Sequence, residues 1–240
     1  YAALKDRDIS LETAKKFGVK VTFDQQGEIY KHIYPYYADN EVIARKTRFA
    51  QNKSFAWAGV GNKAGLFGQN LFKDGGKYIT ITEGECDALA ALTAGYVRVV
   101  SVPDGAPTIS IVDDEHSQKY SYLDDAYDDL LGIEEIIIAT DDDAPGQILR
   151  DDLAKRLGSG RCKWVRYPKG CKDLNDALIA HGPAGVKKSI EDHTSWMPVS
   201  GIYRMSDLPP SPTRPTYALG MGAFDDHMKL RLGDFAVWSG

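Results

Sequence analysis

Tyr78-Ile79-Thr80-Ile81-Thr82-Glu83-Gly84-Glu85 begins as a β-type run and then reaches a carboxylate that glycine follows at once. A second apolar run, at 136–140, is followed by three aspartates at 141–143 and then by Ala-Pro-Gly. Both stretches place acids where a strand would end and a helix would begin. Ligands of parallel α/β sheets bind beyond the carboxyl ends of the strands, so we expect Glu83, Asp141 and Asp143 to meet there.

The chain from residue 77 onward alternates strand-like and helix-like stretches. Strands are expected over 78–82, 97–101, 135–140 and 162–167. Helices are expected over 84–94, 114–130, 145–157, 174–180 and 184–192. Four strands that alternate with helices predict an α/β fold with a mostly parallel sheet and right-handed crossovers.

The preceding part of the chain, residues 1–76, has a different pattern. A short helix is expected near 9–17, and a tyrosine-rich β run is followed by an Asp-Asn turn and a return strand at 42–49. This pattern predicts a small α+β subdomain with β-hairpins. We expect the tyrosines to pack the hairpin, although stacking on bases is the alternative.

Four basic residues lie on or near that return strand. Side chains alternate along a strand, so Lys46 and Arg48 share one face and Arg45 points to the other, while Lys53 follows in a loop. These cations are suited to bind nucleotide phosphates or a template backbone. The alternative is an ordinary charged edge strand, on which lysines prevent aggregation.

The acids of the second part of the chain favour a metal site. Asp173 follows the fourth expected strand and can join Glu83, Asp141 and Asp143. Two carboxylates about 4 Å apart repel each other by roughly 4 kcal/mol at an effective dielectric of about 20. A divalent cation removes this repulsion, and hard oxygen ligands select Mg²⁺ or Mn²⁺; two such ions are expected, in the two-metal arrangement. The alternative for residues 141–143 alone is a solvated helix N-terminus.

Composition and charge restrict the remaining possibilities. The 240 residues are 43% hydrophobic, which is enough for a core, and they contain no apolar run long enough to span a membrane. The three cysteines are scattered and form no CxxC pair, which argues against disulfides and zinc and favours a reducing cytoplasm. Residues 1–77 hold 13 Lys and Arg against 8 Asp and Glu, whereas the remainder holds 16 against 26. A basic front part beside an acidic part suits an enzyme that binds a polyanion.

Three motifs together resemble one family. They are Thr82-Glu83-Gly84-Glu85-Cys86-Asp87, Asp141-x-Asp143-x-Pro145-Gly146 and Lys172-Asp173-x-Asn175-Asp176. These motifs resemble the TOPRIM domain, and nearly the whole chain resembles the primase half of the bifunctional phage primase–helicases, which have a Twinkle-like relative. The resemblance divides the chain into an N-terminal primase subdomain (1–76), a TOPRIM catalytic domain (77–195) and a Pro-rich linker with the start of a RecA-like helicase domain (196–240).

The resemblance also implies roles for the residues. Glu83 would be the metal-linked acid or base, Asp141 and Asp143 the metal ligands, and Asp173 an auxiliary acid. Lys46 and Lys53 would match the family's lysines that contact nucleotide or template. Apart from the resemblance, Arg45, Arg48 and Lys172 are further candidate contacts of nucleotide or DNA.

The expected function is Mg²⁺-dependent synthesis of RNA primers from nucleoside triphosphates on single-stranded DNA. The expected partners are a helicase domain of the same chain and a ring oligomer formed through it, in the cytoplasm of a phage-bearing bacterium rather than in a mitochondrion. A TOPRIM nuclease and a non-catalytic DNA-binding module of a Twinkle-like helicase are the alternatives.

Overall fold

The computed structural model describes residues 1–52, 54–61, 64–71, 76–111, 118–199, 216–220, 222–226 and 230–231. The chain forms two compact units, Tyr1–Val199 and Ser200–Gly240. In the second unit, β10 (Thr216–Tyr217) pairs antiparallel with β11 (Leu230–Arg231), and a 3-10 helix, η6, spans Gly222–Asp226. The predicted linker at 208–215 and the apolar strand at 235–238 lie outside the described residues.

The first unit opens with helix α1 and a four-stranded antiparallel sheet. The 3-10 helix η1 (Lys5–Arg7) precedes α1 (Leu11–Lys16), which begins at Ser10 because the Ser10 side chain accepts a hydrogen bond from the Thr13 amide. The strands, in spatial order, are β1 (Lys20–Phe23), β2 (Ile29–Ala38), β3 (Glu41–Phe49) and β4 (Phe55–Gly59). The predicted hairpin is confirmed: its Asp-Asn turn has φ of 49° and 65°, a conformation that these two residue types tolerate.

A second, five-stranded sheet has the order β6-β5-β7-β8-β9. Its strands are β5 (Gly76–Thr82), β6 (Val99–Ser101), β7 (Ile133–Ala139), β8 (Cys162–Val165) and β9 (Thr194–Trp196). The first four are parallel, as the alternating sequence pattern predicts. The antiparallel edge strand β9 was not predicted; it is short and joins the sheet only through β8.

Helices follow the parallel strands. They are α2 (Glu85–Thr93), α3 (Ser121–Asp125), α4 (Tyr127–Leu131), α5 (Ala144–Leu157) and α6 (Leu174–Glu191). The predicted helix at 114–130 is described as α3 and α4, and its first residues lie outside the described part. The two helices predicted at 174–180 and 184–192 are confirmed as the two halves of α6, which are separated at Gly182, where φ 65° and ψ −169° are not helical, and Pro183 follows.

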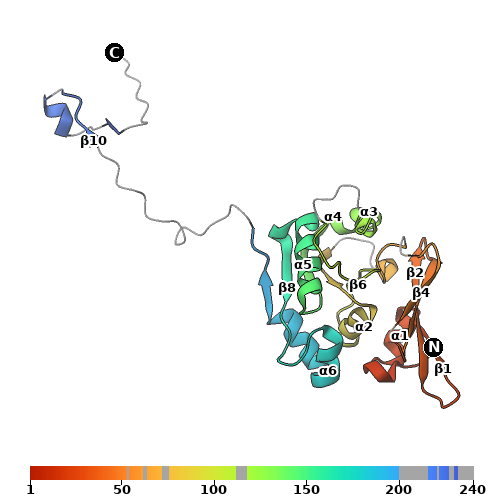
Figure 1. Cartoon of the computed structure of the whole chain (residues 1–240). Helices are drawn as coiled ribbons and strands as arrows, with labels where there is room; N and C mark the ends of the chain where they lie inside the picture. The colour runs from red at the N-terminus through yellow and green to blue at the C-terminus, as the bar shows by residue number, and fades with distance from the viewer. Residues whose placement is uncertain are drawn as a thin grey trace. The chain divides into compact units, whose positions relative to one another are not determined.

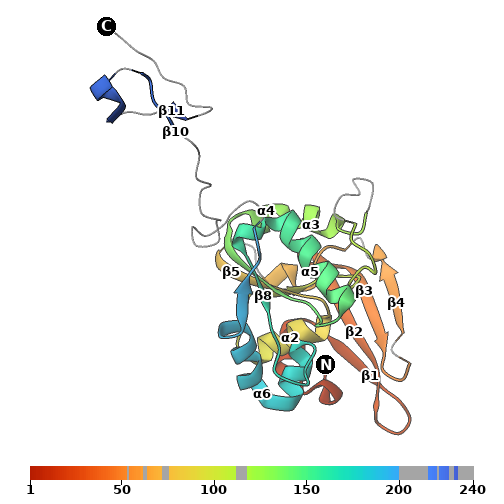
Figure 2. The same ribbon diagram turned by 60° about the vertical axis from the view of Figure 1, so that its left-hand side comes forward.

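The helices cover the two faces of the second sheet (Figures 1 and 2). Along β7, Ile137 and Ala139 pack in one buried cluster with α2 and α6, while Ile136 and Ile138 pack in another cluster with α3, α4 and α5. This alternation follows from the period of two along a strand. The predicted α/β fold with an N-terminal α+β part is confirmed.

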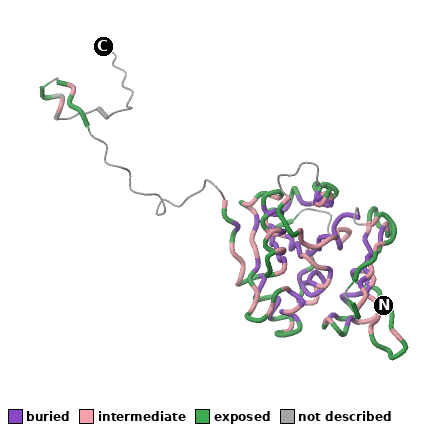
Figure 3. The backbone as a smooth tube through the Cα atoms, viewed as in Figure 1, coloured by how far each residue is buried: buried purple, intermediate pink, exposed green. Residues whose placement is uncertain are grey.

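The two sheets share a core. The cluster that contains α2 and α6 also contains Tyr34 and Tyr36 of β2 and Phe67 of the connecting segment, all of them fully buried. Figure 3 shows the buried backbone running through both parts. These tyrosines therefore pack the core, as expected, and the antiparallel sheet is held beside α2, next to the strand ends of the second sheet.

Candidate active site

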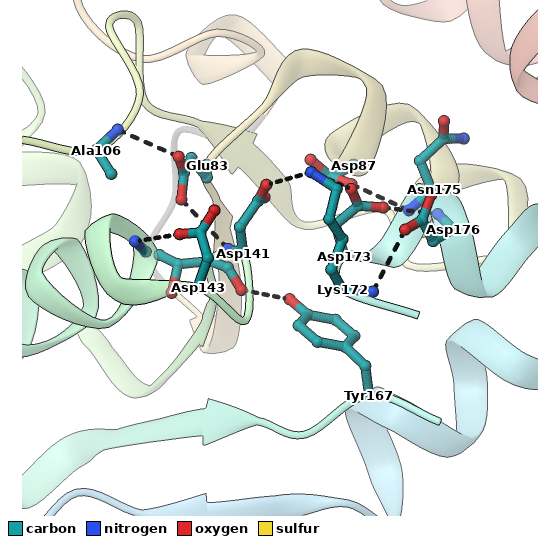
Figure 4. A network of polar contacts seen from close by, with 12 residues as sticks. Glu83, Asp87, Ala106, Asp141, Asp143, Tyr167, Lys172, Asp173, Asn175 and Asp176 are labelled. Atoms are coloured by element: carbon teal, nitrogen blue, oxygen red, sulfur yellow. Dashed lines mark hydrogen bonds and ion pairs between the residues drawn. The ribbon is translucent and has the colours of Figure 1, made fainter. Parts of the chain in front are cut away.

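Glu83 lies at the centre of the strand ends. Thr82 and Ala139, the last residues of β5 and β7, are paired in register, so the segments that follow them leave the sheet at the same level. The Glu83 carboxylate accepts hydrogen bonds from the amide of Asp141 at 3.2 Å and from the amide of Ala106 at 3.3 Å. Figure 4 shows these two bonds fixing the Glu83 side chain between two loops.

Asp141 and Asp143 both lie just before α5 but have different hydrogen-bond partners. Asp141 Oδ2 accepts from Lys172 Nζ at 3.0 Å. The side chain of Asp143 is the N-cap of α5, since Oδ1 accepts from the Gly146 amide at 2.8 Å. Asp143 is exposed, whereas Asp141 is half-buried.

Two more acids lie beside Lys172. Asp173 caps α6 by accepting from the Asp176 amide at 2.6 Å, and it lies 3.7 Å from Lys172 Nζ. Asp87, in the first turn of α2, is buried and accepts from the Asn175 amide at 3.0 Å. The sequence analysis did not select Asp87, although its position four residues after Glu83 in the acidic motif is the signal that could have done so.

Crowding raises the pKa of these acids. Burial, then the charge of Asp141, raises the pKa of Glu83 to about 7, despite the two amide donors. Burial also raises the pKa of Asp141, although the hydrogen bond from Lys172 opposes this. Burial and the neighbouring acids raise the pKa of Asp87 and of Asp173. The site therefore holds more negative charge than the protein compensates.

A cleft of about 410 Å³ joins these acids to the antiparallel sheet. Its lining includes Glu83, Asp87, Asp141, Lys172 and Asp173 from the strand ends, and Lys46, Arg48, Phe55 and Trp57 from β3 and β4. Side chains alternate on β3, as predicted. Lys46 and Arg48 are buried on the cleft side, whereas Arg45 is exposed. Neither Arg45 nor Asp143 lines the cleft, and Lys53 lies outside the described residues.

The donor chemistry of the cleft fits a hard divalent cation. Mg²⁺ prefers carboxylate oxygens as ligands. A nearby positive charge stabilises the ionised form of acids whose pKa values are raised. Within the described part of the chain, no three acidic, histidine or cysteine side chains are already arranged as a metal centre. Lys172 is the cation bonded to Asp141, and a metal ion would compete with it for that carboxylate.

Comparison with known proteins agrees with this geometry. Residues 77–166 match the family model of the Toprim domain. The chain is 38% identical over 139 residues to a Twinkle homolog protein, chloroplastic/mitochondrial, of Arabidopsis thaliana; the match covers 54% of this chain and 20% of the relative.

Two solved structures resemble most of the chain. One is the primase fragment of the bacteriophage T7 primase-helicase, with a TM-score of 0.62, 29% identity, and coverage of 79% of this chain and 74% of that one. In the other, T7 lagging-strand DNA polymerase interacts with primase domains bound to an RNA/DNA hybrid and dTTP. It gives a TM-score of 0.67, 27% identity, and coverage of 82% and 93%. The chain spans only 20% to 36% of the length of three curated relatives that it matches.

Proposed function

On the premise that residues 77–166 are a Toprim domain and that the chain is homologous to the T7 primase fragment, we propose that it synthesises short RNA primers. The substrates would be nucleoside triphosphates, paired to a single-stranded DNA template. One observation carries the proposal: Arg48 of the antiparallel sheet and the acids Glu83, Asp141 and Asp173 line the same cleft. Nucleotidyl transfer needs cations for the phosphates beside acids that can hold metal ions, and the charges on the two sides of this cleft support that assignment.

The Toprim relatives imply divalent metal binding, and the finer assignment is ours. We assign two Mg²⁺ ions, or Mn²⁺, to a ligand set composed of Glu83, Asp141, Asp143 and Asp173. When bound, the ions would neutralise charge on the attacking and leaving oxygens. The raised pKa values of Glu83 and Asp141 support this set, because burial and neighbouring negative charge disfavour the ionised carboxylates, and a bound cation would offset both effects.

Glu83 is the proposed general base. The oxygen of the primer 3′-hydroxyl forms a bond to the α-phosphorus of the incoming nucleotide, the bond to pyrophosphate breaks, and Glu83 takes the hydroxyl proton. In the metal-free chain burial and the charge of Asp141 raise the pKa of Glu83 to about 7, so this carboxylate takes up a proton more readily than a solvent-exposed one. The amides of Ala106 and Asp141 orient the carboxylate for this step.

The phosphate-binding role falls first to Arg48. Its side chain is only 9% exposed, yet it makes no hydrogen bond or ion pair with any residue that the structure describes. A guanidinium in that position is suited to a bidentate contact with a triphosphate. Lys172, whose side chain is 59% exposed, can turn from Asp141 to a phosphate once a metal ion takes its place. Arg45 and Lys53 remain predicted contacts of the template backbone.

The template assignment has support from a relative. The T7 primase domains were solved with an RNA/DNA hybrid and dTTP, and we propose the same classes of ligand, a DNA template and nucleoside triphosphates, for this cleft. A helicase domain in the same chain and a ring oligomer stay predictions from the sequence. No helix among the described residues is long and apolar enough to cross a membrane.

Incubation of the chain with labelled nucleoside triphosphates, single-stranded DNA and Mg²⁺ tests the proposal. Labelled RNA that elongates with time supports it, provided that EDTA and Asp141→Asn both abolish the product. Cleavage of the DNA would instead assign a Toprim nuclease. Binding of DNA with neither product would assign a non-catalytic module.

A further inference from the structure

Lys46 points into the active-site cleft but its charge is already engaged. Its side chain is nearly buried, and Nζ donates to Glu85 Oε1 at 2.7 Å and to the carbonyl oxygen of Pro103 at 2.7 Å. The ring centroids of Phe55 and Trp57 lie 4.7 and 5.6 Å from the same nitrogen. An ammonium group has three N–H donors, so two short bonds and two aromatic faces leave little of this one for a phosphate.

The Glu85 carboxylate, which binds Lys46, is also buried and has a further hydrogen bond. Glu85 is the first residue of α2 and is 4% exposed. Its Oε1 atom also accepts from the hydroxyl of Tyr36 at 2.7 Å. Tyr36 and Lys46 stand on the neighbouring strands β2 and β3, so two side chains of the antiparallel sheet converge on one oxygen of the second sheet's first helix.

These contacts hold both segments that position Glu83. Glu85 lies two residues after Glu83, and Pro103 lies three residues before Ala106, whose amide donates to Glu83. The Lys46 ammonium group therefore ties the start of α2 to the loop after β6. The catalytic carboxylate is held between these two tied segments.

Arg48 provides the contrast on the same strand. It lies two residues further along β3, shares the cleft face, and is paired in register with Phe55. Unlike Lys46, it has no polar partner among the described residues. One face of β3 therefore carries one cation that is engaged and one that is not.

We propose that Lys46 is a positioning residue: with Glu85 and Tyr36 it forms a buried latch that holds the antiparallel sheet and the Pro103 loop around Glu83. Arg48, and not Lys46, supplies the charge for the nucleotide phosphates. The inference rests on the proposed function for its kinetic consequences, but the latch itself is a property of the folded chain. It departs from the family resemblance, by which Lys46 would contact nucleotide or DNA.

Four variants test the latch: Lys46→Met, Glu85→Gln, the double variant, and Arg48→Met. Loss of one partner of a buried ion pair is strongly destabilising, whereas neutral replacement of both partners is often tolerated. Lys46→Met should therefore lower the Tm by roughly 10 °C. Addition of Glu85→Gln should recover at least half of that loss. Arg48→Met should leave the Tm within a few degrees of the parent chain.

The kinetic arm separates positioning from phosphate binding. If Lys46 acts as a latch, the double variant should regain part of the kcat that Lys46→Met loses. Its KM for nucleotide should stay within about threefold of that of the parent chain. Arg48→Met should raise the KM at least tenfold, about the effect of one charge-assisted contact. If Lys46→Met keeps its Tm, raises the KM tenfold and is not rescued by Glu85→Gln, Lys46 is a phosphate ligand and the latch is overturned.

Failure of the proposed function would look different. If the parent chain makes no primer, the kinetic arm is replaced by the affinity for ATP with Mg²⁺, measured by calorimetry. The Tm pattern and the ATP affinities of the same four variants then decide the latch. Rescue of the Tm by Glu85→Gln supports the latch, and additive Tm losses in the double variant contradict it.

Discussion

At the scale of single residues, the Asp143 side chain makes a structural hydrogen bond that is separate from its expected role as a metal ligand. Its carboxylate caps α5 through the Gly146 amide, and asparagine caps a helix about as well as aspartate does. Asp143→Asn should therefore leave the free energy of unfolding unchanged within about 0.5 kcal/mol. Asp143→Ala should lower it by about 1 kcal/mol. If Asp143 binds metal, both variants should lose primer synthesis by roughly a hundredfold.

Urea unfolding and primer synthesis on the two variants measure these effects separately. Asp142→Asn is the matched control, because Asp142 is the exposed neighbour in the same triplet. Full activity in Asp143→Asn would remove Asp143 from the ligand set and leave it only a cap.

The acids of the cleft predict a linkage between protons and metal. Burial raises the pKa of Glu83 in the folded chain to about 7, above the ordinary value of 4.5 for a glutamate, so the folded state favours the protonated form. Without metal, the contribution of this group to stability is fully present below pH 4.5 and is lost as the pH rises to about 7. A divalent ion replaces the proton on this carboxylate. About 5 mM Mg²⁺ should therefore raise the Tm more at pH 7.5 than at pH 5.

Thermal melts at the two pH values, with Mg²⁺ or EDTA, measure this linkage. Glu83→Gln should flatten the metal-free pH dependence and reduce the Mg²⁺ effect at pH 7.5. An equal Mg²⁺ shift at both pH values, unchanged by Glu83→Gln, would contradict a metal site at this carboxylate.

The acids that the sequence predicts for the cleft come after a parallel strand, either directly, as Glu83 does, or after a loop, as Asp173 does. Glu83, Asp141 and Asp173 line the cleft because the ends of parallel strands meet at one edge. Asp87 and Glu85 were not selected, because acids in the first turn of a helix have an ordinary explanation in the helix dipole. Their burial depends on β2, β3 and α6, which no local pattern connects to α2.

At the scale of elements, the turn from β7 into α5 depends on Gly146. A Cβ atom at this position would overlap the backbone of Asp141, which cannot move without displacing the acid. Gly146→Ala should therefore destabilise the chain by roughly 2 kcal/mol or more and abolish metal-dependent activity. Gly160→Ala is the matched control, since a Cβ there has no neighbour within 4 Å and the φ angle is not positive.

Urea unfolding measures the stability of both glycine variants, and a Mg²⁺ titration followed by Tm measures the site. If Gly146→Ala is as stable as Gly160→Ala and keeps its Mg²⁺ response, the close packing of Gly146 against Asp141 does not position the acid.

The sequence predicted the long, periodic elements better than the short ones. Strands β5 and β7 and helices α2 and α5 were expected within one or two residues, because apolar runs, caps and glycines agree there. Strand β9 has only three residues and forms by pairing with β8, which is a tertiary contact. Pro145 lies in the first turn of α5, and Pro183 directly follows the non-helical Gly182 that separates the two halves of α6, so both prolines stand where a helix begins and proline is tolerated.

At the scale of the whole Tyr1–Val199 unit, the two sheets depend on each other for burial. Tyr34, Tyr36 and Phe67 pack in the same cluster as Ala88 and Leu89 of α2. The backbone of Phe67 also exchanges two hydrogen bonds with Ser101, at 2.9 and 3.1 Å, which covers the open edge of β6. Residues 1–75 thus bury one face of α2 and protect one edge of the second sheet.

A fragment of residues 76–199 should therefore not reach the stability of residues 1–199. Removal of the N-terminal part exposes the α2 face and leaves β6 as an unpaired edge, and both changes favour aggregation. We expect residues 1–199 to melt cooperatively at the Tm of the full chain, within about 2 °C, because the remaining residues form a separate unit. Residues 76–199 should melt at least 10 °C lower, or without a cooperative transition, and should bind the dye ANS as exposed apolar surface does.

Calorimetry and ANS fluorescence on the two fragments provide the measurement. A cooperative melt of 76–199 at the Tm of 1–199 would show instead that residues 76–199 fold alone. The latch of Lys46 and Glu85 would then be needed only to align the two sheets.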